Sequence, residues 1–295
     1  MHRPHCLFLF FVFALAAGTI PSAAQDKVYQ TGASEPASGT IVKVDDVNIH
    51  ITLGQIGTTT IPRQRVERVE VPIPPPFNQA LQAFEKNQFS EVAQALEPLY
   101  TKYKGLPQDW LEECAVRLGE SYAELKEWGK AREVFNAIHK FYPQSRFKDE
   151  MAGVEAQIML GLKQPDQARA LLEPLIKNLE EEISKSKEGA LGEDDAKTLG
   201  RAYLVMGQCL LSSNQPKEAL EAFLRTILIF HADANAAANA LYQSALVYEQ
   251  TKNPAQAKGQ LEVLLKEYPA APVASEARKK LETLKVSNPS EGTTP

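Results

Sequence analysis

One arrangement of residues recurs along most of the chain and restricts the fold more than any other feature. A small residue is followed four positions later by a large apolar residue, as in Ala131 with Phe135. The same spacing occurs in four further places: Val92–Leu96, Ala168–Leu172, Ala219–Phe223 and Ala257–Leu261. Successive copies lie about 39, 37, 51 and 38 residues apart. A near-constant period in this range predicts a solenoid of stacked helical units, with no fold expected from one copy alone.

The spacing within the second copy predicts two helices. Apolar residues recur at steps of four and three along residues 111–125, and again along 128–142. These steps place them on one face of a helix. The segment "KEWGK" between them interrupts the pattern, so we expect two antiparallel helices joined by a tight turn.

The second copy resembles the tetratricopeptide repeat family. The family pattern has a small residue and an aromatic residue in the first helix, followed by an alanine, a large apolar residue and a closing proline. All five are present, as Gly119, Tyr122, Ala131, Phe135 and Pro143. Two further copies match well, through Tyr203, Gly207, Ala219 and Phe223, and through Ala245, Tyr248, Ala257, Leu261 and Pro269.

This resemblance covers residues 77–286 and implies a mainly α fold. It predicts a right-handed solenoid of about five helix pairs, in which these residues pack the helices together and carry no chemistry. The long period and the "YP" endings are similar to repeats of bacterial envelope proteins, namely the periplasmic coordinator of the Tol-Pal system and the lipoprotein of the outer-membrane assembly machinery. The chain lacks the lipid-modified cysteine of the second and the N-terminal coiled coil of the first, so their partners are not carried over.

Residues 27–71 have a different pattern. They alternate apolar and polar residues and are rich in Val, Ile and Thr, which predicts strands. Val47, Ile49, Ile51 and Leu53 are expected on one face, with Asp45 and Asp46 in a turn. The segment loosely resembles a small Sm- or SH3-like barrel. Its core is small, so we expect it to pack on the helices or on a second copy. A proline-rich linker, residues 72–76, separates it from the helical part.

The two ends of the chain are predicted to lie outside the fold. Residues 1–24 combine a basic start, an apolar run and small residues, which is typical of a signal peptide. The protein is therefore expected in the periplasm or cell envelope of a bacterium, with membrane contact only if this segment is retained. Residues 287–295 are expected to be a disordered tail.

Two departures from a regular solenoid are also expected. Pro98 and Pro174 occupy the same register in the first and third copies and should each remove a hydrogen bond and kink a helix. The longest interval between copies predicts an extended second helix in the third copy, followed by a mobile charged loop around residues 185–194.

Composition disfavours several functional classes. The net charge is −5 with no concentrated basic stripe, which disfavours nucleic-acid binding. Cys114 and Cys209 are expected to be buried, unpaired thiols. The histidines and cysteines have no metal-ligand spacing, and no catalytic motif stands in a suitable context. We therefore expect no enzyme activity, cofactor or metal.

The remaining candidate is the inner face of the solenoid, lined by the first helix of each pair. Projecting the register onto the second, fourth and fifth copies selects polar and aromatic positions as protein-binding candidates: Glu113, Glu120, Glu124, Arg201, Gln208, Asn239, Tyr242 and Gln250. The groove should be acidic towards one end. The family's carboxylate-binding set of Lys, Asn and Arg does not occur at these positions.

The sequence thus predicts an exported, non-enzymatic scaffold that binds protein segments in a repeat-built groove. The setting indicated by resemblance is envelope assembly or maintenance. The alternative is a structural protein that self-assembles into a homo-oligomer through the β segment and the solenoid ends.

Overall fold

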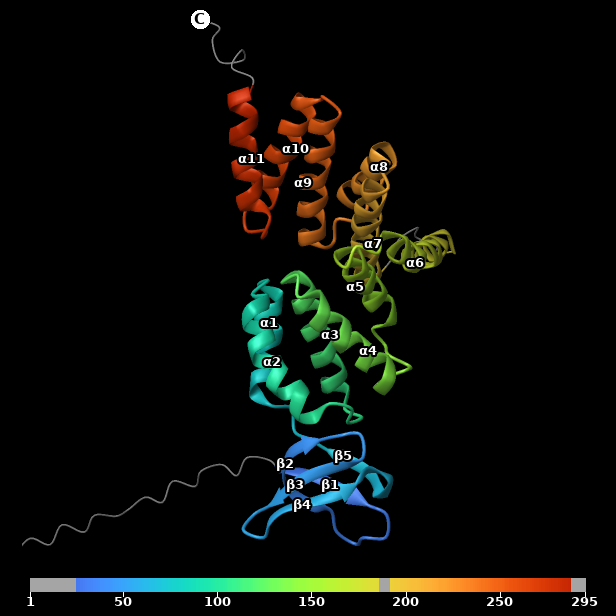
Figure 1. Cartoon of the computed structure of the whole chain (residues 1–295), viewed down its shortest axis with the longest axis vertical. Helices are drawn as coiled ribbons and strands as arrows, with labels where there is room; N and C mark the ends of the chain where they lie inside the picture. Colours follow the sequence, from blue (N-terminus) through green and yellow to red (C-terminus); the bar gives the residue numbers. More distant parts are fainter. Residues whose placement is uncertain (1–24, 186–191, 288–295) are drawn as a thin grey trace, which may run out of the picture.

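The computed structural model describes residues 25–185 and 192–287. A small β-sheet lies at one end, and helices continue away from it along the length of the molecule (Figure 1). The expected signal peptide lies outside the described residues. So do residues 186–191 of the expected charged loop and residues 288–295 of the expected tail.

The sheet has five antiparallel strands in the order β4-β3-β2-β1-β5. The strands are β1 (Asp26–Gln30), β2 (Ala37–Val44), β3 (Asn48–Leu53), β4 (Gly57–Pro62) and β5 (Val66–Glu70). The sheet is open, because β4 pairs with β3 and β5 pairs with β1, which leaves β4 and β5 as edges. The prediction of a small β module is confirmed, but no closed barrel forms.

Alternation along β3 gives the sheet a buried side. Ile49 and Ile51 are 1% and 0% exposed, as predicted for one face. Val47, expected on the same face, is 63% exposed because it lies in the turn before β3. Asp45 forms that turn as predicted, since its Oδ1 accepts bonds from the amides of Val47 and Asn48. A bond with His50 and these amides lower the pKa of Asp45 to about 2.

The helical part comprises eleven described helices, which form five antiparallel pairs and a final single helix. They are α1 (Pro75–Glu85), α2 (Phe89–Tyr103), α3 (Asp109–Glu124), α4 (Trp128–Phe141), α5 (Lys148–Gly161), α6 (Pro165–Lys185), α7 (Glu193–Ser212), α8 (Pro216–Leu228), α9 (Ala234–Gln250), α10 (Pro254–Glu267) and α11 (Ala274–Ser287). The predicted five pairs are therefore present, and α11 covers the end of the last pair.

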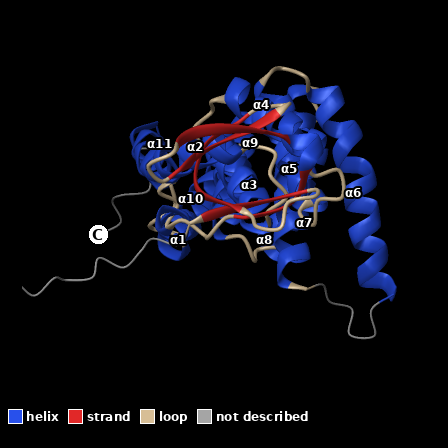
Figure 2. Ribbon diagram, turned by 90° about the horizontal axis from the view of Figure 1, so that it is seen from below, coloured by secondary structure: helices blue, strands red, loops and turns tan. Residues whose placement is uncertain are grey.

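The sheet packs directly on the first helices, with β2 in contact with α2, and in the view of Figure 2 the strands are seen in front of the helical part. Arg63, between β4 and β5, donates through Nη2 to the carbonyl of Gly105 at 2.5 Å. Gln108 Nε2 donates to the carbonyl of Val69 at 2.8 Å. Only residues 71–74 lie between β5 and α1, so the last two prolines of the expected linker begin the helix. The sheet and the first pairs thus share one core.

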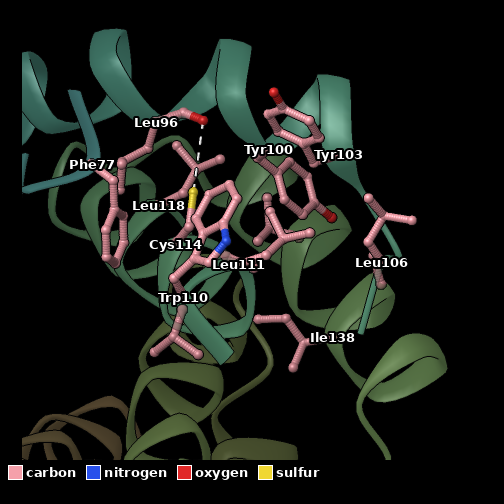
Figure 3. Close-up of a cluster of buried hydrophobic side chains, with 14 of the residues drawn as sticks. Phe77, Leu96, Tyr100, Tyr103, Leu106, Trp110, Leu111, Cys114, Leu118 and Ile138 are labelled. Atoms are coloured by element: carbon pink, nitrogen blue, oxygen red, sulfur yellow. Dashed lines mark hydrogen bonds between the residues drawn. The ribbon is translucent and has the colours of Figure 1, made fainter. Parts of the chain in front are cut away.

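Aromatic side chains from α1, α2 and α3 fill the part of this core between the first helices. Trp110 stands with its ring centroid 5.7 Å from those of both Phe77 and Tyr103 (Figure 3). Cys114 lies in the same cluster and its Sγ is 3.9 Å from the carbonyl oxygen of Leu96. Both Cys114 and Cys209 are buried and unpaired, as predicted, and burial raises the pKa of each thiol.

Contacts within each helix pair explain the repeated small residues. Ala131, Ala219 and Ala257 are fully buried. A Cβ atom added to Gly119 would lie 2.8 Å from the Phe135 ring, and one added to Gly207 would lie closer still to Phe223. The small residue of the first helix thus makes room for the large residue of the second. Tyr122 is 3% exposed and Tyr248 is half-buried, while Pro143 and Pro269 follow the ends of α4 and α10.

A second feature shows that the first and third copies, which match the family pattern poorly, belong to the same series. Each turn between the helices of a pair contains one residue with positive φ, five positions before the small residue that begins the copy's four-residue spacing (Val92, Ala131, Ala168, Ala219 or Ala257). These are Asn87, Lys126, Lys163, Asn214 and Lys252, with φ from 58° to 65°. The five turns therefore have the same local geometry, including those near Val92 and Ala168.

The two internal prolines lie within helices. The described helices α2 and α6 continue through Pro98 and Pro174. The extended second helix of the third copy is confirmed, since α6 has 21 residues. No helix in residues 25–185 and 192–287 is long and apolar enough to cross a membrane.

Candidate functional site

The inner face of the solenoid contains a cavity of about 690 Å³ to which all five pairs contribute. We call this cavity the groove. Its lining comes from the first helices, from the turns within pairs, from the first residues of α2, α4 and α6, and from the loop before α9: Phe84, Asn87, Phe89, Glu120, Ala123, Glu124, Lys126, Trp128, Gly153, Val154, Gln157, Leu160, Gly161, Lys163, Pro165, Arg201, Leu204, Val205, Gln208, Leu211, Ser212, Asp233, Asn235, Ala236, Asn239 and Gln243. Its volume is in the range of protein sites for small or extended ligands.

Helix α5 supplies the central part of the lining, and its contribution is mainly apolar and small. Gly153, Val154, Leu160 and Gly161 all line the groove. Gly161 lets the neighbouring pair approach closely, because a Cβ atom there would overlap the indole ring of Trp128. Trp128 is half-buried and forms part of the rim. This part of the groove can therefore hold apolar groups.

Amide side chains project into the groove from three successive first helices. Gln157 comes from α5, Gln208 from α7, and Asn239 and Gln243 from α9. All four are half-buried, and Asn239 Nδ2 donates to the carbonyl of Asn235 in its own helix at 3.0 Å. A primary amide both donates and accepts hydrogen bonds, which matches the alternating groups of an extended peptide backbone. The groove thus combines apolar surface with groups that can bond to main chain.

A network of ion pairs underlies the middle of the groove. Glu120 is only 3% exposed, and its carboxylate lies between Arg117 Nη1 at 2.6 Å and Arg201 Nη1 at 2.9 Å. Arg117 also contacts Glu150 at 2.6 Å. Burial raises the pKa of Glu120, although the two guanidinium groups act to lower it. The network joins α3, α5 and α7 and neutralises the acid.

Asp233 links this network to the start of α9. Its Oδ1 accepts bonds from the amides of Asn235 and Ala236 at 2.9 and 3.0 Å, which caps the helix. Its Oδ2 accepts a bond from Nε of Arg201. Burial acts to raise the pKa of Asp233, but Arg201 and the amides outweigh it and the pKa is lowered. Arg201 therefore orients the entry of the chain into the last pair.

The first and last pairs meet across the groove. Asn235, at the start of α9, donates to the side-chain oxygen of Asn87 in the turn between α1 and α2. These residues are 148 positions apart. The solenoid therefore curves far enough to bring the turn of the first pair against the start of α9.

The remaining charges lie at the rim. Glu124, Lys126 and Lys163 are exposed to solvent, yet line the groove. The Glu124 side chain is accessible from the groove, but the surrounding helices desolvate its carboxylate and so raise the pKa of Glu124. Counting the buried network, three acids and three bases line the groove, so the charges of the lining balance as a whole, and an acidic end stays a prediction.

The structure brings five of the eight predicted groove residues together: Glu120, Glu124, Arg201, Gln208 and Asn239. Three others do not line the groove. Glu113 pairs with Arg146 at 3.4 Å, Tyr242 is half-buried in the cluster of the last pair, and Gln250 is exposed at the end of α9. Arg201, predicted to hold a ligand, has its guanidinium bound by Glu120 and Asp233. A role in binding stays a prediction for all eight.

Sequence reasoning missed much of the lining. Gln157 and Leu160 belong to the third copy, which matches the family pattern poorly. Trp128 follows the turn within the second pair, and that position did not predict a groove contact. Gln157 could have been found from the repeat spacing, because it lies 11 positions before Ala168. Two predicted groove residues have the same spacing in their own copies: Glu120 lies 11 positions before Ala131, and Gln208 lies 11 positions before Ala219. Asn235 had no such signal, because the groove crosses the last helix nearer its start than the others.

Residues 25–185 and 192–287 contain no group of three or more His, Cys, Asp or Glu side chains placed to hold a metal ion. Two acids of the groove, Glu120 and Asp233, are engaged with guanidinium groups.

A family model for the tetratricopeptide repeat matches residues 113–145 and 239–271. These two segments are thus similar to tetratricopeptide repeats. They correspond to the second and fifth helix pairs, and the common turn geometry extends the series to all five. The sequence has no match among curated proteins.

Solved structures with similar folds include a Rap protein complexed with Competence and Sporulation Factor. The TM-score is 0.54 at 15% identity, covering 72% of this chain and 64% of that one. A tetratricopeptide repeat protein of Thermus thermophilus has a TM-score of 0.48 at 13% identity, covering 72% of this chain and 97% of that one. This chain spans less than two thirds of the Rap protein's length, and at this identity the likeness shows the fold alone.

Proposed function

We propose that this protein is a non-enzymatic adaptor that binds an extended protein segment in the groove. The observation that carries the proposal is the lining itself, in which amides from three first helices stand beside apolar side chains within one cavity. Amides can bond to a peptide backbone of any sequence, and apolar surface contributes affinity through burial. The Rap protein of similar fold, solved in complex with a factor, supports ligand binding by such a solenoid.

We further propose that the protein is exported and acts in the periplasm or cell envelope of a bacterium. The support is the pattern of residues 1–24, with a basic start, an apolar run and small residues before Gln25. The mature protein in an envelope fraction should begin near Gln25 by N-terminal sequencing. Recovery of Met1 on that protein would indicate a retained membrane anchor instead.

The groove is tested by selecting its ligands from a random library, which requires no known partner. A displayed library of random 12-residue peptides is selected on the purified protein, and enriched peptides are labelled and measured by fluorescence anisotropy. Replacing Gln157 and Gln208 together by alanine should weaken binding about tenfold or more, through lost hydrogen bonds. Gln250→Ala is the matched control, since this amide lies on α9 outside the groove. Equal affinity of all variants would place the binding surface elsewhere.

A second candidate function is self-assembly, and the exposed edge of the sheet favours it. β4 is unpaired on one side, and Val42, Val47 and Ile56 on the β module are 47%, 63% and 88% exposed. An open edge with apolar neighbours can pair with another chain. Light scattering of the purified protein separates the two, because self-assembly requires a mass that rises with concentration above that of one chain.

A further inference from the structure

Gly153 has no packing reason to be a glycine. It lies near the middle of α5, where glycine is an unfavourable residue. A Cβ atom added there would meet no heavy atom within 4 Å beyond its own helix backbone and chain neighbours, in contrast to Gly119 and Gly207, where it would overlap an aromatic ring. The space next to Gly153 is part of the groove. The missing side chain therefore deepens the groove and makes no closer contact between helices.

The groove lining along this part of α5 and α7 includes apolar side chains as well as the amide of Gln157, one turn after Gly153. Val154 is next to Gly153 and 4% exposed, and Leu160 continues the lining along α5. Leu204 comes from α7, which packs beside α5, and is half-buried. A hollow with such walls stabilises a bulky apolar side chain, because the ligand group removes apolar surface from water.

Two lysines at the groove rim carry charge that the described residues do not pair. Lys126 and Lys163 occupy the same positive-φ position in successive turns, are exposed and line the groove. Neither makes an ion pair within the described part of the chain. The acids nearby are Glu124, which also lines the groove, and Glu276 of α11, whose pKa Lys126 helps to lower. The other charged lining residues, Glu120, Arg201 and Asp233, bond to one another.

We propose that the groove selects a segment with a bulky apolar side chain, which lies over Gly153, and an acidic side chain, which meets Lys126 and Lys163. This inference rests on the proposed function and specifies its ligand. Gly153 and Lys163 are ten residues apart along α5 and its turn, or about 15 Å at the rise of a helix. An extended chain covers that distance in about four or five residues. The partner therefore carries the two side chains at that spacing.

The test uses the peptides enriched on the purified protein. We expect them to share Leu, Ile, Met or Phe with Asp or Glu four or five positions away. Gly153→Leu fills the hollow and should weaken their binding at least tenfold. Gly259→Leu is the matched control, because Gly259 lies in the middle of α10 with equally open space and outside the groove, and it should change affinity less than twofold.

The charged part is tested by reversal. The double variant Lys126→Glu, Lys163→Glu should weaken binding about tenfold, and a peptide with Lys in place of its acid should restore it. Lys252→Glu is the control, since it has the same turn position in the last copy and lies outside the groove. If Gly153→Leu does not fold by circular dichroism, replacing the peptide's bulky residue by alanine gives the same comparison on the parent protein.

The outcomes separate this inference from the proposed function. Peptides that lose affinity for the Gln157→Ala, Gln208→Ala variant but bind Gly153→Leu and the double reversal like the parent would overturn the inference and leave the groove function standing. Peptides insensitive to all groove variants, or no enrichment at all, would overturn both.

Discussion

The two faces of the first helices use small residues for opposite purposes. Towards the second helix of each pair, Gly119 and Gly207 admit the rings of Phe135 and Phe223. Towards the groove, Gly153 admits no group of the protein. The packing face is thus filled, and the groove face retains space together with an exposed acid, Glu124. The glycine–aromatic contacts of the packing face stabilise the fold. The open space at Gly153 and the acid Glu124 on the groove face reduce the stability of the fold and leave room for a ligand.

The largest expected effect comes from emptying the packing face. Phe135 is 1% exposed and lies against Gly119, so Phe135→Ala removes a fully buried ring and leaves a void. The free energy of unfolding should fall by about 3–5 kcal/mol. Urea denaturation measures this, with Tyr242→Ala as a comparison at a half-buried aromatic position. An unchanged midpoint would show that the proposed contact is absent.

The packing face was largely predictable from sequence, and the reason is physical. A contact that is repeated in every pair requires residues of the same size at the same spacing. Ala131, Phe135 and Gly119 could therefore be found because residues of similar size recur at these positions in other copies. Groove residues carry no such requirement, because a ligand selects each position separately. Gln157 was missed in a degenerate copy. The partners of Arg201 could not be predicted, since Asp233 lies in a loop whose course the repeat does not determine.

The sheet shows a different limit. The turn at Asp45 and the alternation of Ile49 and Ile51 follow from local residue properties, and both were predicted. Whether a five-stranded sheet closes depends on how its edge strands meet, which no local pattern specifies. The contact of Arg63 with Gly105 shows that packing on the helices fixes the position of the sheet.

Overfilling the packing face should have a smaller effect. Ala131 is fully buried between the helices of the second pair, so Ala131→Leu forces neighbouring groups apart. We expect a loss of about 1–3 kcal/mol in the free energy of unfolding. Thermal unfolding followed by circular dichroism measures it. Ala170→Leu, at an exposed position of α6, should leave the transition unchanged.

The opposite sign is expected at the groove. Gly153→Ala adds a side chain into open space and removes the conformational freedom of glycine in a helix, so the protein should gain about 0.5–1 kcal/mol. Urea denaturation measures this gain, and the variant Gly119→Ala, which should lose stability, is measured for comparison. A loss at both positions would remove the distinction between the two faces.

The smallest effect concerns Glu124 and depends on pH. Because desolvation by the surrounding helices raises the pKa of Glu124 above the usual 4.5, the folded state favours the protonated form, although the side chain is accessible from the groove. The stabilising contribution is fully present below about pH 4.5 and is lost as pH rises through the folded pKa. Glu124→Gln should therefore unfold at slightly higher urea concentration than the parent at neutral pH, and this gain should vanish in acid. A gain independent of pH would point to another cause.

The central claim is that the groove holds an extended protein segment, and site-specific photo-crosslinking tests it most directly. A benzophenone amino acid replaces Gln208 inside the groove or Glu221 on α8, which is 71% exposed and outside it. The account predicts that an enriched peptide crosslinks through Gln208, that unlabelled peptide competes, and that Glu221 gives no product. Crosslinking through Glu221, or through a probe at Ile56 of the β module, with none at Gln208 would contradict it.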